Sequence, residues 1–357
     1  MCQRVIRRVK VMTAITMNQG SRQAAEILRE ARDLVDPVLR ASIGSLPAAM
    51  RRIGGYHLGW WDRHGVPQES GGGKVLRPAL VLAAARAAGG DTSGAIKAAA
   101  AVELTHNFTL LHDDVMDGDL TRRHRPTAWS VFGRDDAILA GDALQALAIR
   151  LLVEDMHPAA VRAAQRLTGC VIELCEGQHE DCAFEGRDEV TLEQCLAMAG
   201  AKTGALLGCA CALGALYAGA ADRVLEGLDA FGREVGLAFQ LIDDVLGIWG
   251  DPAVTGKPVG ADLAARKKSL PVVAALTSGT PAGARLAAFY RTQRPVEGAL
   301  ATRTADLVER AGGRAWAQAQ AAVHTDAAVT GLATLLPDSA AAGDLLVLAE
   351  LITHRNW

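Results

Sequence analysis

Aromatic side chains are scarce in this 357-residue chain, where Phe, Trp and Tyr together make up 4% of the residues. Aromatic and β-branched residues favour strands, whereas Ala and Leu, which recur throughout the chain, favour helices. No segment alternates apolar and polar residues with a period of two, so we predict no strand. The composition therefore indicates an all-α protein.

Further absences narrow the classes of function. The net charge is −3, so no global cationic field exists that would attract nucleic acid. The seven cysteines are odd in number and include no CxxC pair, which argues against a disulfide framework and favours a reducing cytoplasm. We interpret most of them as small core residues. The first 20 residues are basic but contain no apolar run long enough for a secretory signal.

One apolar stretch, residues 204–221, reaches the length of a candidate membrane span. It carries no charge, but it is rich in Ala and Gly and lies between Lys202 and Asp222 inside a longer helical pattern. A helix that is buried on all sides in a large bundle explains these features better, so we predict no membrane span.

Long segments of helical apolar periodicity, separated by Gly, Pro and Asp, follow one another along the chain. The predicted helical segments are 21–52, 75–89, 94–117, 135–155, 158–184, 191–218, 221–249 and 268–277, with more toward the C-terminus. A loop from Gly54 to Gly73 follows the first of these segments. This organisation predicts one large bundle of about ten or more helices over residues 21–357, preceded by a flexible leader at 1–20.

The first chemical motif is an aspartate cluster near the end of a predicted helix. Asp113, Asp114 and Asp117 follow the pattern DDxxD, which brings their carboxylates together. Like charges this close destabilise a helix unless a cation lies between them, and the dipole at a helix C-terminus disfavours them further. The alternative is a solvated acidic helix end, but the motif continues an apolar face. The cluster therefore indicates a metal site.

A second copy of this layout strengthens the metal hypothesis. Asp243 and Asp244 again end an apolar helical segment and precede a glycine-rich loop. Gly247 stands where a third aspartate would be, and Asp251, one turn further along the same predicted face, is a candidate substitute. The two copies predict helices that face each other across a cavity. Oxygen ligands with few His or Cys favour Mg²⁺, which binds through one or two carboxylates plus substrate phosphates.

Cationic side chains accompany both aspartate sets. Arg122 and Arg123 follow the first set after a short loop, and Lys74 and Arg77 lie in GGGKVLRP, a glycine-rich turn that opens a helix and favours phosphate. Further lysines near helix ends or loops are Lys202, Lys257, Lys267 and Lys268. Each cation alone is more often a solvated surface residue. Beside two aspartate sets, however, they predict a diphosphate site, because Arg suits phosphate oxygens and Lys supplies a point charge.

In this order along an all-α chain, the motifs resemble those of the trans-isoprenyl diphosphate synthase (polyprenyl synthetase) family. They are a GGxKxxRP-type loop, HxxxxxHDDxxDxxxxRR, GQ, KT, FQxxDD and GK, within about residues 70–270. The resemblance implies the isoprenoid synthase fold with a central cavity, and a homodimer. It also implies a Mg²⁺-dependent transferase of the short-chain branch, which condenses isopentenyl diphosphate with allylic diphosphates to give geranylgeranyl diphosphate.

The resemblance also implies roles for individual residues. About three Mg²⁺ ions on the allylic diphosphate would be held by Asp113, Asp117 and Asp243, with support from Asp114 and Asp244. The departing pyrophosphate would be stabilised by Arg122, Lys202 and Lys257. The diphosphate of isopentenyl diphosphate would be bound by Lys74, Arg77, His106 and Arg123. Oxygen dipoles would be directed at the allylic carbocation by Thr203 and Gln240.

The length of the product depends on Phe108 in this interpretation. Phe108 lies five residues before Asp113, about 7.5 Å along the helix, where a ring in an apolar tunnel would stop a growing tail. In the family, an aromatic residue at this position with no insertion in DDxxD accompanies a C20 product, and a second bulky residue one place later accompanies C15. The next residue here is the small Thr109. We therefore favour C20 over C15, with an ordinary core role as the alternative for Phe108.

Three other classes of protein share part of the pattern. An HD-type metal phosphohydrolase would use His112–Asp113, but it needs further His ligands and does not explain FQLIDD or the arginine pair. A class I terpene cyclase shares DDxxD, but usually pairs it with an Asn/Ser/Glu motif, which does not appear after residue 220, and it has no need for Lys74 and Arg77. A catalytically weak partner subunit would lose aspartates or cations wholesale, whereas only Gly247 replaces a carboxylate here.

Overall fold

The structure is a computed structural model that describes residues 22–68, 75–251, 260–291, 299–336 and 339–353. Its N-terminal half contains α2 (Ala24–Gly44), α3 (Ala48–His57), α4 (Leu76–Ala87), η1 (Thr92–Ala95), α5 (Ile96–Met116), β1 (Thr121–Arg122), β2 (Arg125–Pro126), α6 (Ala128–Phe132), α7 (Arg134–Val153) and α8 (Ala160–Gly186). Its C-terminal half contains α9 (Leu192–Ala199), η2 (Gly200–Gly204), α10 (Ala205–Tyr217), α11 (Asp222–Trp249), α13 (Ala261–Ala264), α14 (Leu270–Leu276), α15 (Pro281–Tyr290), α16 (Ala299–Arg310), α17 (Gly313–Leu335) and α18 (Ser339–Thr353). The predicted all-α bundle of about ten or more helices is confirmed.

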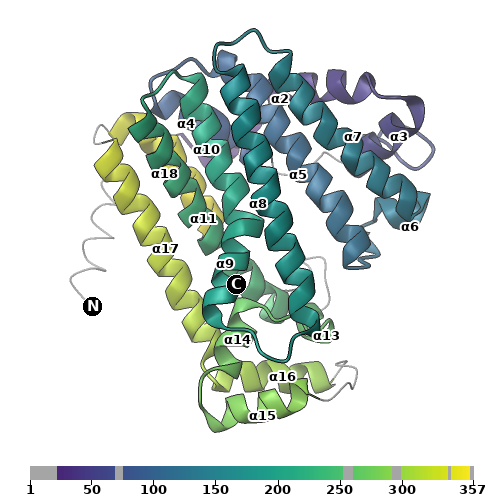
Figure 1. Cartoon of the computed structure of the whole chain (residues 1–357), viewed down its shortest axis with the longest axis vertical. Helices are drawn as coiled ribbons and strands as arrows, with labels where there is room; N and C mark the ends of the chain where they lie inside the picture. The colour runs from purple at the N-terminus through teal and green to yellow at the C-terminus, as the bar shows by residue number, and fades with distance from the viewer. Residues whose placement is uncertain (1–21, 69–74, 252–259, 292–298, 337–338, 354–357) are drawn as a thin grey trace.

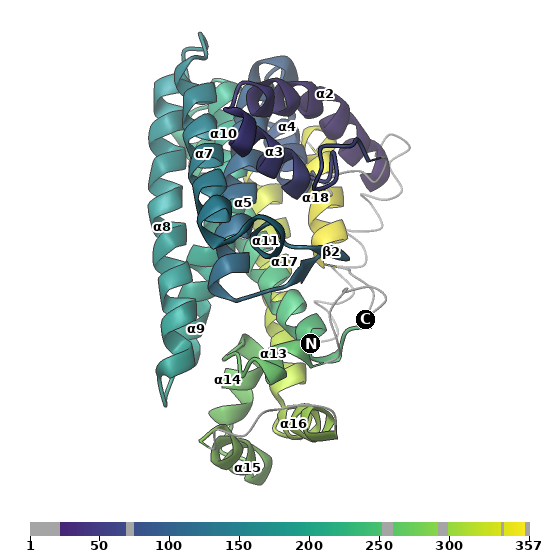
Figure 2. The ribbon, with the colours of Figure 1, turned by 90° about the vertical axis from the view of Figure 1, so that its right-hand side faces the viewer.

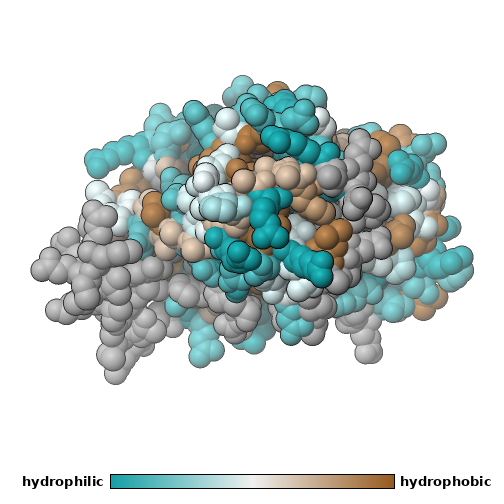
Figure 3. All heavy atoms as spheres, turned by 90° about the horizontal axis from the view of Figure 1, so that it is seen from below, coloured by the Kyte–Doolittle hydropathy of each residue, from teal (hydrophilic) through white to brown (hydrophobic). Residues whose placement is uncertain are grey.

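The long helices run roughly upright around α10, and α13 to α16 form a smaller group at one end (Figure 1). Every residue of α10 is buried, and so is most of α4, which packs against it. Turned by 90°, the molecule shows the β1–β2 hairpin between the α2–α3 layer and this smaller group (Figure 2). In Figure 3, which views the protein from that end, hydrophilic residues lie among apolar ones over the described part of the face.

The predicted helix at 191–218 is the one helix in the described residues that is long and apolar enough to cross a membrane. Residues Leu192–Tyr217 meet that test, and 72% of the most apolar window is buried inside the protein. Neighbouring helices therefore cover the apolar stretch, as they cover a core helix of a bundle.

Glycines allow the central helices to approach closely. A Cβ atom on Gly214 of α10 would lie 2.2 Å from the carbonyl oxygen of Val81 in α4. On Gly232 of α11, a Cβ atom would lie 2.3 Å from the carbonyl oxygen of Leu207 in α10. Both contacts are shorter than van der Waals distance, so these positions accept only glycine at the present helix spacing.

Two local predictions for the N-terminal region were wrong. The predicted helix 21–52 is broken after Gly44, because Pro47 disfavours the helical conformation of the residue before it and lacks an N–H group. The predicted loop at Gly54 begins only after His57, since α3 continues through Gly54 and Gly55. Trp61 packs on Gly55 so closely that a Cβ atom there would lie 1.9 Å from its ring, and this tertiary contact overrides the low helix propensity of glycine.

The prediction of no strand was wrong for four residues. Thr121 pairs with Pro126, and Arg122 pairs with Arg125, in a short antiparallel hairpin. The two turn residues between the strands, Arg123 and His124, have φ angles of 52° and 62°, as a two-residue hairpin turn of the I′ type requires. Strands of two residues are too short to display a period in the sequence. The predicted leader at 1–20 lies outside the described residues.

The close contact at Gly214 can be tested by Gly214→Ala. We expect the added methyl group to push α10 and α4 apart and to lower the free energy of unfolding by about 1–3 kcal/mol. Gly331→Ala is the matched control, because Gly331 is an exposed helical glycine with nothing within 4 Å of the point that an added Cβ atom would occupy. That change should stabilise the protein by about 0.5–1 kcal/mol. Urea denaturation followed by circular dichroism measures both; effects of the same sign would refute the packing argument.

Candidate active site

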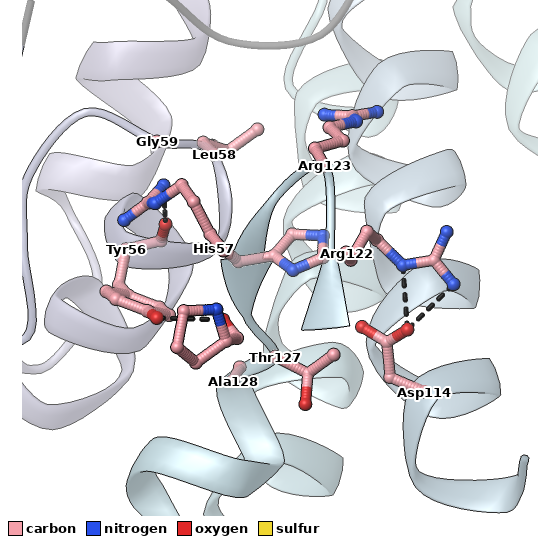
Figure 4. A pocket seen from close by; sticks show the side chains of 11 residues that line it. Tyr56, His57, Leu58, Gly59, Asp114, Arg122, Arg123, Thr127 and Ala128 are labelled. Carbon is pink, nitrogen blue, oxygen red and sulfur yellow. Dashed lines mark hydrogen bonds and ion pairs between the residues drawn. The ribbon is translucent and has the colours of Figure 1, made fainter. Parts of the chain in front are cut away.

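The first aspartate set lies at the C-terminal end of α5, with Asp113 and Asp114 in the last turn and Asp117 as the first residue after the helix. Asp117 is exposed, Asp113 is half-buried and Asp114 is buried. Both Nε and a terminal nitrogen of Arg122 lie 2.7 Å from Oδ1 of Asp114 (Figure 4). The second oxygen, Oδ2, is buried and accepts no hydrogen bond. Burial raises the pKa of Asp114 to about 6 although Arg122 opposes the shift. An ionised Asp114 therefore lacks a partner for one of its two oxygens.

The second aspartate set lies on α11, with Asp243 exposed and Asp244 buried. Asp244 accepts hydrogen bonds from Nε2 of Gln240 at 2.7 Å and from the backbone N–H of Leu270 at 2.9 Å. The hydroxyl of Thr203 in turn donates to Oε1 of Gln240 at 2.6 Å. Burial raises the pKa of Asp244 to about 7. The structure thus joins three predicted site residues into one chain of hydrogen bonds.

Two lysines from different segments of the chain share one carboxylate. Nζ of Lys202 lies 2.5 Å from Oδ2 of Asp181, a residue of α8, and Nζ of Lys267 lies 3.3 Å from the same oxygen. Burial favours the neutral form of Lys267, but nearby carboxylates raise its pKa overall. Those carboxylates are, in order of effect, Asp181, Asp262, Asp244 and Asp117. Lys267 therefore lies in the electrostatic field of both aspartate sets.

The backbone that carries Lys202 and Thr203 is not regular α-helix. The predicted single helix over 191–218 is interrupted by a π-helical turn at Gly200–Gly204, a feature often found at functional sites. Gly177 of α8 makes room for this turn, because a Cβ atom there would lie 2.5 Å from the backbone nitrogen of Lys202. The turn and the close helix contact together place Lys202 over Asp181.

The second set has a carboxylate neighbour at the position of its missing aspartate. A Cβ atom on Gly247 would lie 2.1 Å from Oδ2 of Asp262, so the Asp262 side chain lies directly over the glycine. The sequence-based substitute, Asp251, does not lie on the same helix face, because α11 ends at Trp249 and Gly250 is extended. Thus Asp262, and not Asp251, supplies the carboxylate nearest to Gly247.

A pocket of about 120 Å³ lies beside the first aspartate set, between the end of α3 and the β1–β2 hairpin (Figure 4). Arg122, Arg123 and Arg125 all line it. His106 of α5 lies near, and burial together with Arg77, Arg123 and Arg122 holds its pKa well below the usual value. The structure therefore brings His106, Arg77 and Arg123 together, whereas Lys74 and Lys257 lie outside the described residues.

Phe108 lies one turn below the first aspartates on α5 and is half-buried. Its ring packs edge-on against His112 with the ring centroids 4.8 Å apart. Gly141 of α7 faces both rings, since a Cβ atom there would lie 2.4 Å from His112 and 3.5 Å from Phe108. The contact of α5 with α7 thus holds the Phe108 ring, and its effect on chain length stays a prediction.

The donor set fits Mg²⁺ only when a substrate completes it. Within the described ranges, no group of three or more His, Cys, Asp and Glu side chains is arranged to hold a metal ion. The candidate donors are carboxylates on two different helices, and Asp114 Oδ2 is buried without a partner. Mg²⁺ prefers oxygen ligands and commonly completes its shell with water and phosphate oxygens. These residues therefore fit a metal–diphosphate complex better than a metal alone.

Sequence reasoning missed Asp181 and Asp262 and placed Lys267 only among the dispersed lysines. Asp181 lies in the acidic stretch EGQHED, where nothing distinguishes a buried carboxylate from a solvated one. The only available signal was its distance of three residues from Gln178, which places both residues on the same face of α8. Asp262 follows a glycine-rich loop of undetermined path in the sequence, so its proximity to Gly247 could not be inferred.

Comparisons with known proteins agree on one family. The family model described as polyprenyl synthetase matches residues 68–306. The geranylgeranyl diphosphate synthase of Mycobacterium tuberculosis (strain ATCC 25618 / H37Rv) is 51% identical over 331 residues, which cover 92% of this chain and 93% of the relative. The (2E,6E)-farnesyl diphosphate synthase of Mycobacterium bovis is 46% identical over 341 residues, or 94% of each chain.

Solved structures agree with these relatives. A polyprenyl synthetase from Streptomyces coelicolor A3(2) superimposes with a TM-score of 0.87 at 44% identity, covering 92% of this chain and 98% of that one. A geranylgeranyl pyrophosphate synthase from Corynebacterium glutamicum, complexed with isoprenyl diphosphate and magnesium, superimposes with a TM-score of 0.80 at 25% identity. That match covers 94% of this chain and 100% of the other.

Asp244→Asn tests the energetic cost of the buried carboxylate. The pKa of Asp244 is raised to about 7, whereas an Asp carboxyl in an unfolded chain has a pKa of about 3.9. The folded state therefore keeps a proton that the unfolded state releases. The contribution of this group to stability is complete below about pH 4 and is lost as the pH rises through about 7. With EDTA present, we expect Asp244→Asn to be more stable than the parent protein. The difference between their free energies of unfolding should grow as the pH rises from about 5 to about 8.

Urea denaturation at each pH measures this difference. Asp243→Asn is the matched control, because that side chain is exposed one residue earlier on the same helix. The control should follow the pH profile of the parent protein. Identical profiles for the two variants would show that burial of Asp244 is not the source of the pH dependence.

Proposed function

Starting from the fact that the chain belongs to the polyprenyl synthetase family, and is therefore a trans-prenyltransferase, we propose that it makes all-trans geranylgeranyl diphosphate. The reaction condenses isopentenyl diphosphate head to tail with allylic diphosphates until the product has 20 carbon atoms. Members of this family are generally Mg²⁺-dependent, and we propose about three Mg²⁺ ions in each active site.

The observation that best supports this proposal is the position of Lys267. Its ammonium group interacts with Asp117 of the first aspartate set and with Asp244 of the second, although α5 and α11 are far apart in the sequence. The pKa of Asp113 responds to both Lys202 and Lys267, although burial is the largest influence on it. Carboxylates and lysines from distant segments thus share one space, which suits a dianionic or trianionic group coordinated by metal ions.

The allylic diphosphate would bind between the two sets. The Mg²⁺ ions there would be held by Asp113, Asp117 and Asp243, with Asp114 and Asp244 in support. When bound, Mg²⁺ supplies the positive charge that offsets the diphosphate. Lys202, Lys257 and Arg122 stabilise the negative charge that develops on the leaving pyrophosphate, and Lys267 joins them because it lies beside Lys202 on Asp181.

The isopentenyl diphosphate would bind on the other side of Asp114. Its phosphate oxygens receive positive charge from Lys74, Arg77 and Arg123 and a hydrogen bond from His106, which is a neutral donor because its pKa is low. Arg123 is suited to this role by its place at the hairpin turn, where it is exposed. The double bond of the bound molecule then attacks the allylic carbocation.

Thr203 and Gln240 would stabilise that carbocation through oxygen dipoles. The hydroxyl hydrogen of Thr203 is directed at Gln240, so the remaining lone pairs of the Thr203 oxygen are available to the cation. Neither group needs to act as a nucleophile. Loss of a proton to the pyrophosphate completes one elongation, and a dry cavity prevents water from quenching the cation.

Chain length is the finer part of the proposal. A relative named geranylgeranyl diphosphate synthase is 51% identical, but one named farnesyl diphosphate synthase is 46% identical, so similarity alone does not separate C20 from C15. Phe108 is half-buried one turn below the aspartates, and the following residue is Thr109. One large ring at this level, without a second bulky neighbour, supports C20. We also propose that the enzyme is a cytoplasmic homodimer.

A product assay tests the function. Purified protein, Mg²⁺ and isopentenyl diphosphate are incubated separately with dimethylallyl, geranyl and farnesyl diphosphates, and mass spectrometry measures product length. We expect elongation to C20 with each primer. A limit at C15 would retain the enzyme class and reject the C20 assignment. Cyclisation or hydrolysis of a lone allylic diphosphate without elongation would instead favour the cyclase.

Phe108→Ala tests the determinant of chain length. Removing the ring deepens the space below the aspartates, so we expect products longer than C20 in the same assay. Leu110→Ala is the matched control, because residue 110 points to a different side of α5 and should leave the product distribution unchanged. An unchanged product from Phe108→Ala would mean that the ring is an ordinary core residue.

A further inference from the structure

His57, at the last position of α3, lines the pocket beside the hairpin and belongs to neither set of predicted phosphate ligands. Its Nε2 atom is inaccessible to solvent and makes no hydrogen bond in the structure. Figure 4 shows the imidazole extending from α3 toward the hairpin strand that carries Arg122. A buried polar atom without a partner destabilises a fold, unless a ligand forms the missing hydrogen bond.

The surroundings of His57 are cationic on the hairpin side. Arg122, Arg123 and Arg125 all lower the pKa of the ring, whereas Asp114 is the one acidic residue among the described residues that line the pocket. Burial, followed by the effects of Arg123 and Arg122, lowers the pKa of His57 to about 3. The ring is therefore neutral at physiological pH and carries one N–H group.

The three arginines differ in the hydrogen bonds and ion pairs that they already make within the protein. Arg125 donates to the backbone oxygens of Tyr56 and Trp61 and lies over the Tyr56 ring, so its role is to fasten the hairpin to α3. Arg122 is paired with Asp114. Arg123, at the turn, makes no hydrogen bond or ion pair with any residue in the described part of the chain. An uncommitted guanidinium and an imidazole with an uncommitted Nε2 thus line the same small pocket.

We infer that His57 is a further substrate-binding residue, whose Nε2–H donates a hydrogen bond to a phosphate oxygen of isopentenyl diphosphate. A neutral donor suits this position, because three arginines already supply charge and a fourth positive group would repel them. The inference rests on the proposed function. It assigns the ring to the isopentenyl side because His57 shares its pocket with Arg123, a proposed ligand of isopentenyl diphosphate, whereas Lys202 and Lys267 do not line this pocket.

Two hydrogen bonds hold the end of α3, which carries His57, in place. The hydroxyl of Tyr56 donates to the carbonyl oxygen of Pro126 at 2.8 Å, and Trp61 donates through Nε1 to the carbonyl oxygen of Arg52 at 2.8 Å. These bonds join α3 to the hairpin and close the turn behind His57. The imidazole and Arg123 are therefore presented by two segments with a fixed spacing, as a diphosphate site requires.

His57→Phe removes the donor and keeps the ring volume. Isothermal titration calorimetry with isopentenyl diphosphate in EDTA measures binding in the absence of metal, and steady-state assays measure both KM values. We expect the Kd and KM for isopentenyl diphosphate to rise about tenfold or more, because a hydrogen bond to a charged group is lost. The KM for farnesyl or geranyl diphosphate and the product length should stay unchanged. His57→Gln, which retains an N–H donor, should recover part of the affinity.

His64→Phe is the matched control, because His64 is exposed in the connection that follows α3. Circular dichroism and the Tm of each variant report its folding. If His57→Phe folds and binds isopentenyl diphosphate as the parent protein does, the inference is wrong while the proposed function stands. An equal loss of affinity for isopentenyl and allylic diphosphates would likewise overturn the assignment. If the parent protein itself neither binds nor elongates isopentenyl diphosphate, the proposed function fails first.

Discussion

The burial of carboxylates, with the repulsion between neighbouring carboxylates that accompanies it, is the constraint on which the rest of this structure depends. Asp113 and Asp114 on α5 and Asp244 on α11 all lose water, and burial raises the pKa of each of them. The protein offsets this repulsion only in part, through Arg122 on one side and the two lysines on Asp181 on the other. Divalent cations, which we propose as part of the substrate complex, would stabilise the ionised carboxylates directly.

The helical frame makes this confinement possible. Glycines at the contacts of α4, α10 and α11 bring the backbones together, so the central helices cannot move apart without losing packing. The same type of contact, at Gly177, presses α8 against the π turn that carries Lys202 and Thr203. Close packing of small residues thus affects the candidate active site indirectly, because it fixes the positions of the helices that carry the charged side chains.

The candidate active site divides into two anion-binding regions with different means of attraction. Between α5 and α11 the protein presents carboxylates with a minority of lysines, which suits a diphosphate that arrives with metal ions. Beside the hairpin it presents arginines and neutral imidazoles, which suit a diphosphate without metal. Asp114, which is paired with Arg122, lies at the boundary between the two regions, because it lines the pocket and also belongs to the first aspartate set. In the proposed function, this division would separate two substrates that carry the same diphosphate group.

The amino-acid sequence by itself determined the all-α class, most helix positions, the two aspartate sets and the family, because these depend on local periodicity and on residue types at short spacings. Tertiary structure decided what no local pattern records. The π turn at Gly200–Gly204 depends on contact with α8, and the helical state of Gly54 and Gly55 depends on Trp61. Three further features arise only when segments distant in the chain meet: the pairing of Asp181 with two lysines, the place of Asp262 over Gly247 and the burial of His57. The reason is that burial and Coulomb interactions depend on distance in space and not on distance along the sequence.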